Sequence, residues 1–183
     1  MKLLRIVKYL LTHYFYQPLR FYGNVQSPLF LKGKKYIELG SCFNGGNNLR
    51  FECIDKYLEF SYSPRLIIGH DVSMNNNVHI GVILEVVIGD NCLFGSNILI
   101  TDHSHGDTHK FKATQSVYKI LELHSSGPVR IGSNVWLGDN VSILDNTRIG
   151  DNSIVGANSV VKGSFPANSI IAGVPGKVIR TIE

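Results

Sequence analysis

The chain has 183 residues, of which 44% are hydrophobic and 17% are charged. This composition is typical of a folded globular protein and excludes a largely disordered chain. The formal net charge of +4 arises at one end, because residues 1–35 hold seven basic side chains and no acid, whereas the rest hold eleven basic and fourteen acidic ones. Nucleic-acid-binding proteins usually spread basic charge over the folded binding face, so no nucleic-acid partner is expected.

Residues 1–22 are predicted to form a basic amphipathic helix. The apolar residues of one face are Leu3, Leu4, Val7, Leu10, Leu11 and Tyr14, and the basic residues of another are Lys2, Arg5 and Lys8. Such a helix can cap the first coil of the fold or lie on an anionic membrane surface. Because Arg5 and Lys8 interrupt the apolar stretch, it is not expected to span a bilayer, and it lacks the cleavage site of a secretory signal.

Cys42, Cys53 and Cys92 are odd in number and form no C-x-x-C pair. This usage suits reduced thiols that pack as small core residues. We therefore expect a cytoplasmic protein, which the N-terminal helix could hold at the inner face of the cytoplasmic membrane. Residues 23–65 are expected to form irregular first coils beginning near residue 30, since Ile37, Phe43 and Leu49 keep a spacing of six.

From about Leu66 onward the sequence repeats every six residues. Aliphatic side chains lead the last repeats at Ile131, Leu137, Ile143, Ile149, Val155 and Val161, and asparagines follow at 134, 140, 146, 152 and 158. Neither a helix nor an amphipathic strand has this period, whereas a coil of short strands and tight turns does. The sequence thus predicts an all-β solenoid, a parallel β-helix, with the aliphatic residues inside and Asn at corners that need left-handed backbone.

One long loop is predicted to protrude from this solenoid. The lead positions Ile100 and Ile131 are 31 residues apart, and the segment 101–130 between them begins with T-D-H-S-H-G. His103, His105 and His109 fit three roles: a general base, a metal site or a polar loop. Asp102 could orient an imidazole or cap the turn. For a zinc site, His103 and His105 would need a third ligand, such as His79, His109 or His124.

The hexapeptide frame resembles that of the left-handed β-helix acyltransferases, over residues 66–183. The left hand is implied by this resemblance, because the period alone does not fix it. The segment "ITDHSHG" is similar to the catalytic loop of the maltose and galactoside O-acetyltransferases, and most resembles the branch that acetylates O-antigen and other surface polysaccharides. The segments "IGSNVWLGDNVSI" and "ANSIIAGVPGKVIR" are similar to the acyl-CoA channel and the closing coenzyme A segment of those enzymes.

The resemblance implies a role for each matching residue. His103 takes the place of the general base, with Asn75, His105 and Asp102 on the acceptor side. The residues in coenzyme-A-contacting positions are Trp136, Ala157, Lys162, Lys177 and Arg180. The resemblance also implies a homotrimer in which His103 and Trp136 serve one site from different subunits. This chain lacks the helical N-terminal segment with which the sugar acetyltransferases contact their acceptors, so those contacts do not carry over.

The expected function is acetyl-CoA-dependent O-acetylation of a sugar hydroxyl of a bacterial surface polysaccharide or its precursor. A neutral imidazole suits removal of the hydroxyl proton, and the chemistry requires no metal and no covalent nucleophile. Three alternatives stay open: a free-sugar or antibiotic O-acetyltransferase, a zinc enzyme of the carbonic anhydrase type, and a purely structural solenoid.

Overall fold

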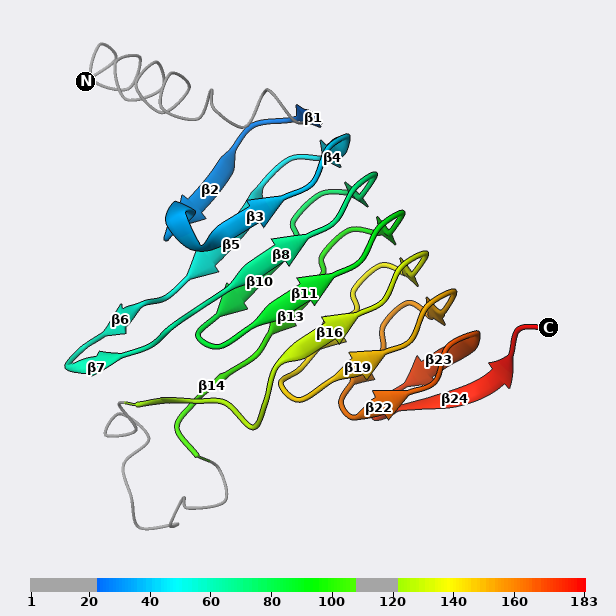
Figure 1. Ribbon diagram of the computed structural model, residues 1–183. Coiled ribbons are helices and arrows are strands. Elements are labelled where there is room, and N and C mark those ends of the chain that lie inside the picture. The colour runs from blue at the N-terminus through cyan, green and yellow to red at the C-terminus, as the bar shows by residue number, and fades with distance from the viewer. Residues whose placement is uncertain (1–22, 108–121) are drawn as a thin grey trace.

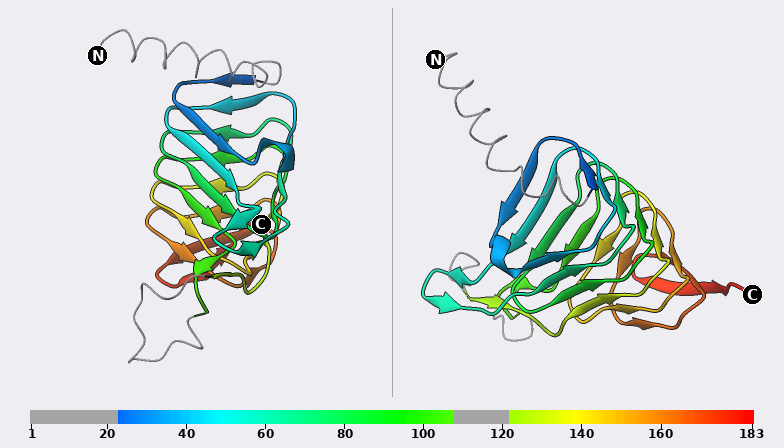
Figure 2. Two further views of the ribbon diagram at one scale, coloured as in Figure 1. Left: turned by 90° about the vertical axis from the view of Figure 1, so that its left-hand side faces the viewer. Right: turned by 45° about the horizontal axis from the view of Figure 1, so that its top comes forward.

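The computed structural model describes residues 23–107 and 122–183, and in these ranges the chain winds into a three-sided prism (Figure 1). Each turn of the chain adds one strand to each of three sheets, so sequential strands lie on different faces (Figure 2). All strand pairs within the three sheets are parallel except the last, β23 with β24. The predicted parallel β-helix is confirmed. The predicted helix of residues 1–22 lies outside the described residues.

Sheet A contains β1 (Gly23–Val25), β4 (Phe43–Gly45), β9 (Ser73–Met74), β12 (Leu93–Phe94), β17 (Trp136–Leu137), β20 (Ile154–Val155), β23 (Ser169–Gly173) and β24 (Gly176–Thr181). Sheet B contains β2 (Leu29–Lys32), β5 (Leu49–Cys53), β10 (His79–Val82), β13 (Leu99–Thr101), β18 (Ser142–Ile143) and β21 (Val160–Val161). Sheet C contains β3 (Ile37–Leu39), β8 (Leu66–Ile68), β11 (Val86–Ile88), β16 (Val129–Ile131), β19 (Arg148–Ile149) and β22 (Ser164–Phe165). A short 3-10 helix, Lys34–Tyr36, precedes β3.

The core consists of side chains stacked from coil to coil inside the prism. Ile68, Ile88, Ile131 and Ile149 are aligned in sheet C, and each is at most 2% exposed. Burying one such side chain stabilises the fold by about 1.5–3 kcal/mol. Because every coil repeats this contact, the prism is a rigid support for anything attached to its corners.

Asparagine rows hold one corner of the prism. In one row, five asparagines lie in line, and the side-chain nitrogen Nδ2 of each donates to the Oδ1 atom of the next at 2.9–3.1 Å. The pairs are Asn48 to Asn77, Asn77 to Asn97, Asn97 to Asn140 and Asn140 to Asn158. The backbone angle φ of these residues is 58–61°. Asn tolerates this left-handed conformation better than other residues with a side chain, which explains its recurrence.

The first coils are more regular than the sequence analysis expected, and their frame differs by two residues. Parallel pairing begins with β1 at Gly23, and Leu39, not Ile37, is aligned with Ile68. Phe51, not Leu49, is aligned with Ile80. In a strand, residues two apart point to the same side, so the six-residue spacing was real but marked the earlier of the two inward-facing positions of each strand.

Departures from the six-residue rhythm cluster at one corner, where sheet B passes to sheet C. There the hairpin of β6 (Lys56–Tyr57) and β7 (Phe60–Ser61) leaves one coil, residues 83–85 widen the next, and the predicted loop leaves the third (Figure 1). The ends of that loop pair as β14 (Ser104–His105) and β15 (Leu123–His124). We call these three segments the corner insertions. None of the described residues forms a helix suited to crossing a membrane.

Candidate active site

Asp102 and His103 form a dyad at the base of the predicted loop, in which Asp102 is buried and His103 is partly exposed. The Asp102 side chain is 0% exposed, and its Oδ1 atom lies 3.0 Å from Nδ1 of His103. The same carboxylate accepts hydrogen bonds from the backbone N–H groups of Ile83, at 2.9 Å, and Leu84, at 2.8 Å. Both roles considered for Asp102 are thus realised, since it holds a turn and orients an imidazole. The expected place of Asp102 on the acceptor side stays a prediction, and its 0% exposure favours an action through His103.

The structure leaves the other ring nitrogen of His103 available. The side chain is 11% exposed. Its Nε2 atom has no hydrogen-bond partner in the described residues. Every buried side-chain nitrogen or oxygen in these residues does have a partner. Nε2 is therefore accessible to solvent. When Nδ1–H donates to Asp102, Nε2 carries the lone pair. The ring of His103 is thus held by Asp102 through one nitrogen, and its other nitrogen has no hydrogen-bond partner in the described residues.

Gly81 makes room for this imidazole. The ring lies over the outer face of β10, where a Cβ atom added to Gly81 would come within 3.1 Å of the Cε1 atom of His103. On the same strand, Nε2 of His79 lies 3.0 Å from Oε2 of Glu52. Burial is the main influence that lowers the pKa of His79, and the charge of Arg50 adds to it. The hydrogen bond to Glu52 opposes this shift without reversing it, so the environment of His79 favours its neutral form.

His105 lies two residues further along, on β14. It is exposed, and its ring is 5.7 Å from the ring of Tyr57 on β6, at an interplanar angle of 63°. The sequence analysis missed the β6–β7 hairpin. The sequence does contain a signal for this hairpin. Phe51 in sheet B and Ile68 in sheet C are inward-facing residues of successive sides of one coil, and they are 17 residues apart instead of six. The misplaced frame concealed this spacing.

The remaining predicted residues divide into two groups. Trp136 is 50% exposed on sheet A, in a row with Leu93, Ile154, Ile170 and Arg180. Asn75 and Ala157 are exposed at the corner between sheets A and B, and Lys177 is exposed on β24. The expected donor-side residues Trp136, Ala157, Lys177 and Arg180, and the expected acceptor-side residue Asn75, therefore lie away from the corner that carries His103.

Lys162 belongs instead to the corner that carries His103, where it follows β21 two coils further on. Its Nζ atom lies 2.6 Å from Oδ1 of Asp145, whose Oδ2 accepts a hydrogen bond from the backbone N–H of Ser126 at 2.9 Å. Burial acts to raise the pKa of Asp145, but these two partners hold that pKa below its ordinary value. Lys162 therefore secures the end of the loop in this chain.

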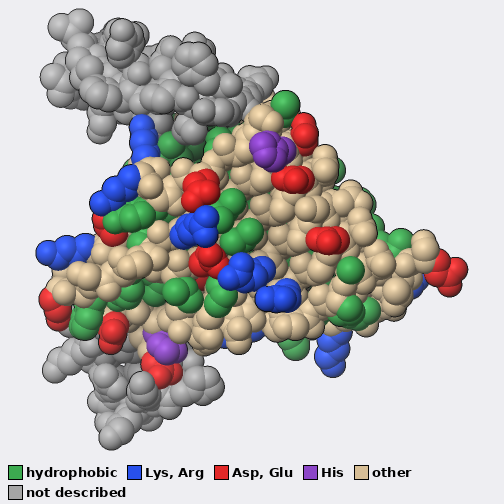
Figure 3. Space-filling view, in the orientation of Figure 1, with side chains coloured by type: hydrophobic (Ala, Val, Ile, Leu, Met, Phe, Trp, Pro, Cys, Tyr) green, Lys and Arg blue, Asp and Glu red, His purple; other side chains and the backbone are tan. Residues whose placement is uncertain are grey.

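The outer faces of the sheets differ in character. Basic and acidic side chains interleave on the face of sheet C (Figure 3), where Arg65 pairs with Glu38 and Arg130 with Glu85. Sheet A instead presents an apolar row, with Leu93 and Trp136 each at least 50% exposed.

His109, a candidate ligand of the zinc site considered above, lies outside the described residues. Within the described ranges no three His, Cys, Asp or Glu side chains are grouped as metal ligands.

The comparisons with known proteins identify the class to which this parallel β-helix belongs. Residues 128–163 match the family described as bacterial transferase hexapeptide (six repeats), and residues 85–98 match the hexapeptide repeat of succinyl-transferase. The chain is 37% identical over 176 residues to the putative lipopolysaccharide biosynthesis O-acetyl transferase WbbJ of Escherichia coli K12, which covers 93% of this chain and 83% of the relative.

Other similarities agree. The galactoside O-acetyltransferase of E. coli K12 is 38% identical over 68% of this chain and 58% of its own length. Among solved structures, a maltose O-acetyltransferase from Clostridium difficile 630 has a TM-score of 0.64 at 27% identity, covering 82% of this chain and 72% of that one. A galactoside acetyltransferase in complex with coenzyme A has a TM-score of 0.61 at 32% identity, covering 82% and 68%. This chain belongs to the hexapeptide-repeat acetyltransferases.

Proposed function

We propose that the protein transfers an acetyl group from acetyl-CoA to a sugar hydroxyl of a bacterial surface polysaccharide or its precursor. The observation that carries the proposal is the dyad: a buried Asp102 fixes His103 so that Nε2 faces solvent at the corner insertions. The polysaccharide acceptor is supported by the similarity to the lipopolysaccharide O-acetyl transferase. The coenzyme A complex of the galactoside acetyltransferase supports the donor.

In this proposal His103 acts as general base. Nε2 removes the proton of the sugar hydroxyl as its oxygen attacks the thioester carbonyl, and the resulting tetrahedral intermediate expels the coenzyme A thiolate. The imidazolium then returns the proton to the sulfur, while Asp102 stabilises its charge through Nδ1. Backbone N–H groups at the coil corners are suited to stabilise the oxygen anion of the intermediate.

Donor binding is assigned to the group on sheet A and the adjoining corner. Trp136 and its apolar row suit the pantetheine arm, and Lys177 and Arg180 suit the phosphates. Asn75 would contact the acceptor or the reacting groups from the A–B corner. Because His103 lies at a different corner of the same prism, these groups meet only if a second subunit supplies one of them. We therefore include a homotrimer with its sites between subunits.

Replacement of His103 tests the chemistry. His103→Ala should lower kcat by about two to four orders of magnitude while coenzyme A binding and oligomeric state persist. His105→Ala is the matched control, since it removes a neighbouring imidazole that is not held by a buried carboxylate. Wild-type turnover in His103→Ala, with the loss in His105→Ala instead, would transfer the role of base to His105.

Subunit mixing tests the shared site. At an acetyl-CoA concentration well below the KM of Trp136→Ala, the variants His103→Ala and Trp136→Ala are each expected to be nearly inactive, but trimers refolded from an equal mixture should regain activity. If each site takes the two residues from neighbouring subunits, about a quarter of the sites in random trimers carry both wild-type residues. A mixture no more active than its components would place the site within one subunit and contradict the proposal.

The acceptor class is tested by mass analysis of products formed with polysaccharide fragments, free sugars and aminoglycosides. Acetylation of fragments is expected, whereas exclusive acetylation of free sugars or antibiotics would favour the alternative.

The basic amphipathic sequence of residues 1–22 supports contact with the inner membrane surface, where lipid-linked acceptors are carried. Co-sedimentation with anionic but not neutral vesicles is the expected result.

A further inference from the structure

The β6–β7 hairpin is fixed against the loop that carries the histidines. In its stem, the Tyr62 Oη atom accepts a hydrogen bond of 2.9 Å from the backbone N–H of Leu123 on β15, and Leu123 is only 3% exposed. The backbone N–H of Tyr62 donates to the carbonyl of Asp55 at 2.9 Å, which closes the hairpin. The hairpin and the loop ends therefore form one unit, and strand β14 of this unit directly follows the Asp102–His103 dyad in the chain (Figure 1).

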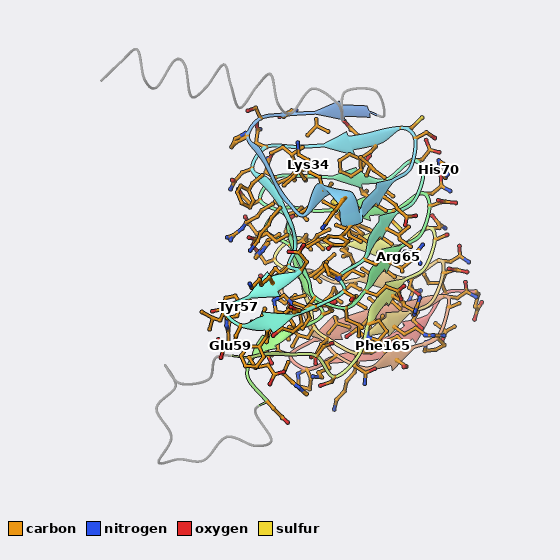
Figure 4. The ribbon with its side chains drawn as sticks, turned by 60° about the vertical axis from the view of Figure 1, so that its left-hand side comes forward. Lys34, Tyr57, Glu59, Arg65, His70 and Phe165 are labelled. Atoms are coloured by element: carbon orange, nitrogen blue, oxygen red, sulfur yellow. The ribbon has the colours of Figure 1, made fainter. Side chains whose placement is uncertain are left out.

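The end of this hairpin presents apolar surface and an open polar group next to His105. Tyr57 lies opposite Phe60 across the two strands, and its ring contacts that of His105. Within the described ranges, neither the Tyr57 hydroxyl nor a ring nitrogen of His105 has a hydrogen-bond partner. Tyr57 and Glu59 point outward from the hairpin (Figure 4). The edge facing the loop can thus still bind hydroxyl groups.

Leu58, at the turn of the hairpin, is unusual in conformation and exposure. Its φ is 54°, and eleven of the thirteen described non-glycine residues with positive φ are Asn or Asp. The Leu58 side chain has no polar atom that could hydrogen-bond to the backbone and relieve this conformation. The residue is nevertheless 51% exposed. A bulky residue held in left-handed backbone costs about 1–3 kcal/mol and often marks a functional position. Packing among residues 23–107 and 122–183 does not explain it, so its apolar side chain points to a ligand contact.

We propose that the tip of the β6–β7 hairpin, Tyr57, Leu58 and Phe60, is the acceptor-binding wall of the active site. This inference rests on the proposed function. A pyranose has an apolar face of C–H groups and a rim of hydroxyls, so one face can pack on these side chains. The Tyr57 hydroxyl and His105 would then hold the rim and decide which sugar hydroxyl reaches His103. The hairpin would thereby supply the acceptor contacts of the site.

Leu58→Asn gives the sharpest test, because Asn favours left-handed backbone and the variant should keep or raise the melting temperature. We expect its KM for the acceptor to rise roughly tenfold, as for loss of one apolar contact in a binding site. The KM for acetyl-CoA should stay unchanged. Tyr57→Ala should show the same split, and Tyr57→Phe should change the ratio of acetylated positions.

Phe30→Ala is the matched control, because Phe30 is an exposed aromatic residue, 48% accessible, on β2 of sheet B. It should leave both KM values unchanged. If Leu58→Asn and Tyr57→Ala retain wild-type kinetics with the acceptor that the wild type acetylates, the hairpin is not the acceptor wall. If the wild type acetylates no carbohydrate at all, the proposed function itself fails, which is a separate result.

Discussion

Asp102→Asn changes one oxygen of a buried carboxylate into an amide nitrogen and leaves its volume almost unchanged. In the native chain three N–H groups donate to this carboxylate. The backbone N–H of Ile83 and the ring Nδ1–H of His103 donate to Oδ1, and the backbone N–H of Leu84 donates to Oδ2. An Asn side chain offers one acceptor atom, so its NH2 group must face at least one donor. One buried unsatisfied donor costs about 1–3 kcal/mol, equivalent to a fall of roughly 2–12 °C in melting temperature for a chain of this size.

The catalytic consequence depends on which side the amide nitrogen takes. If it faces Leu84, the imidazole keeps its orientation but loses the negative charge that stabilises the imidazolium. If it faces His103, it donates to Nδ1, and the proton moves to Nε2, which can then no longer accept one. Either outcome lowers kcat, by about 10²–10⁴-fold, without weakening the binding of acetyl-CoA.

Steady-state kinetics with saturating acetyl-CoA, together with thermal unfolding, measure both effects. Asp90→Asn is the matched control, because the Asp90 carboxylate also accepts a corner N–H, that of His70 at 2.7 Å, but contacts no catalytic imidazole. It should leave kcat unchanged. Wild-type turnover in Asp102→Asn would refute the assignment of Asp102 as the group that orients His103.

Gly81→Ala should lower kcat roughly tenfold with little change in melting temperature, because the new methyl group displaces the His103 ring by a few tenths of an ångström; kinetics indistinguishable from wild type would contradict that contact. Trp136→Ala should raise the KM for acetyl-CoA more than it lowers kcat, and isothermal titration with coenzyme A checks the binding loss directly. Lys162→Met should lower the melting temperature at pH 7, with a difference that shrinks below about pH 4. Asp145 has a lowered pKa, so the stability it contributes is present above the ordinary carboxyl pKa and is lost as the pH falls through its native value. A difference independent of pH would disprove that linkage.

The prism could be predicted because one local rule repeats in each coil. An inward aliphatic side chain and an Asn in left-handed backbone recur every six residues, so Ile131 and Asn134 state the same rule as Ile149 and Asn152. The first coils obscured the rule. Gly45 is aligned with Met74 and Leu39 with Ile68, and an alternating strand offers two inward residues from which to choose the frame.

The site was predictable in chemistry but not in arrangement. The break in the repeat located His103, and its neighbour Asp102 was a candidate partner. No sequence pattern shows that a carboxylate is 0% exposed or that it accepts the N–H groups of Ile83 and Leu84, because those residues belong to the preceding coil. The contact of Tyr57 with His105 joins residues 48 positions apart and likewise depends on stacking of coils.

The asparagine rows have a direction, because every amide nitrogen donates toward the later coil. An added coil of 18 residues, the separation of Asn140 and Asn158, would accept from the coil before it and donate to the coil after it without any change in either. Gene duplication can therefore lengthen this protein by whole coils, and a partial coil would reverse or interrupt the amide chain. Evolution of its size is expected to proceed in such units, while the reactive corner stays as it is.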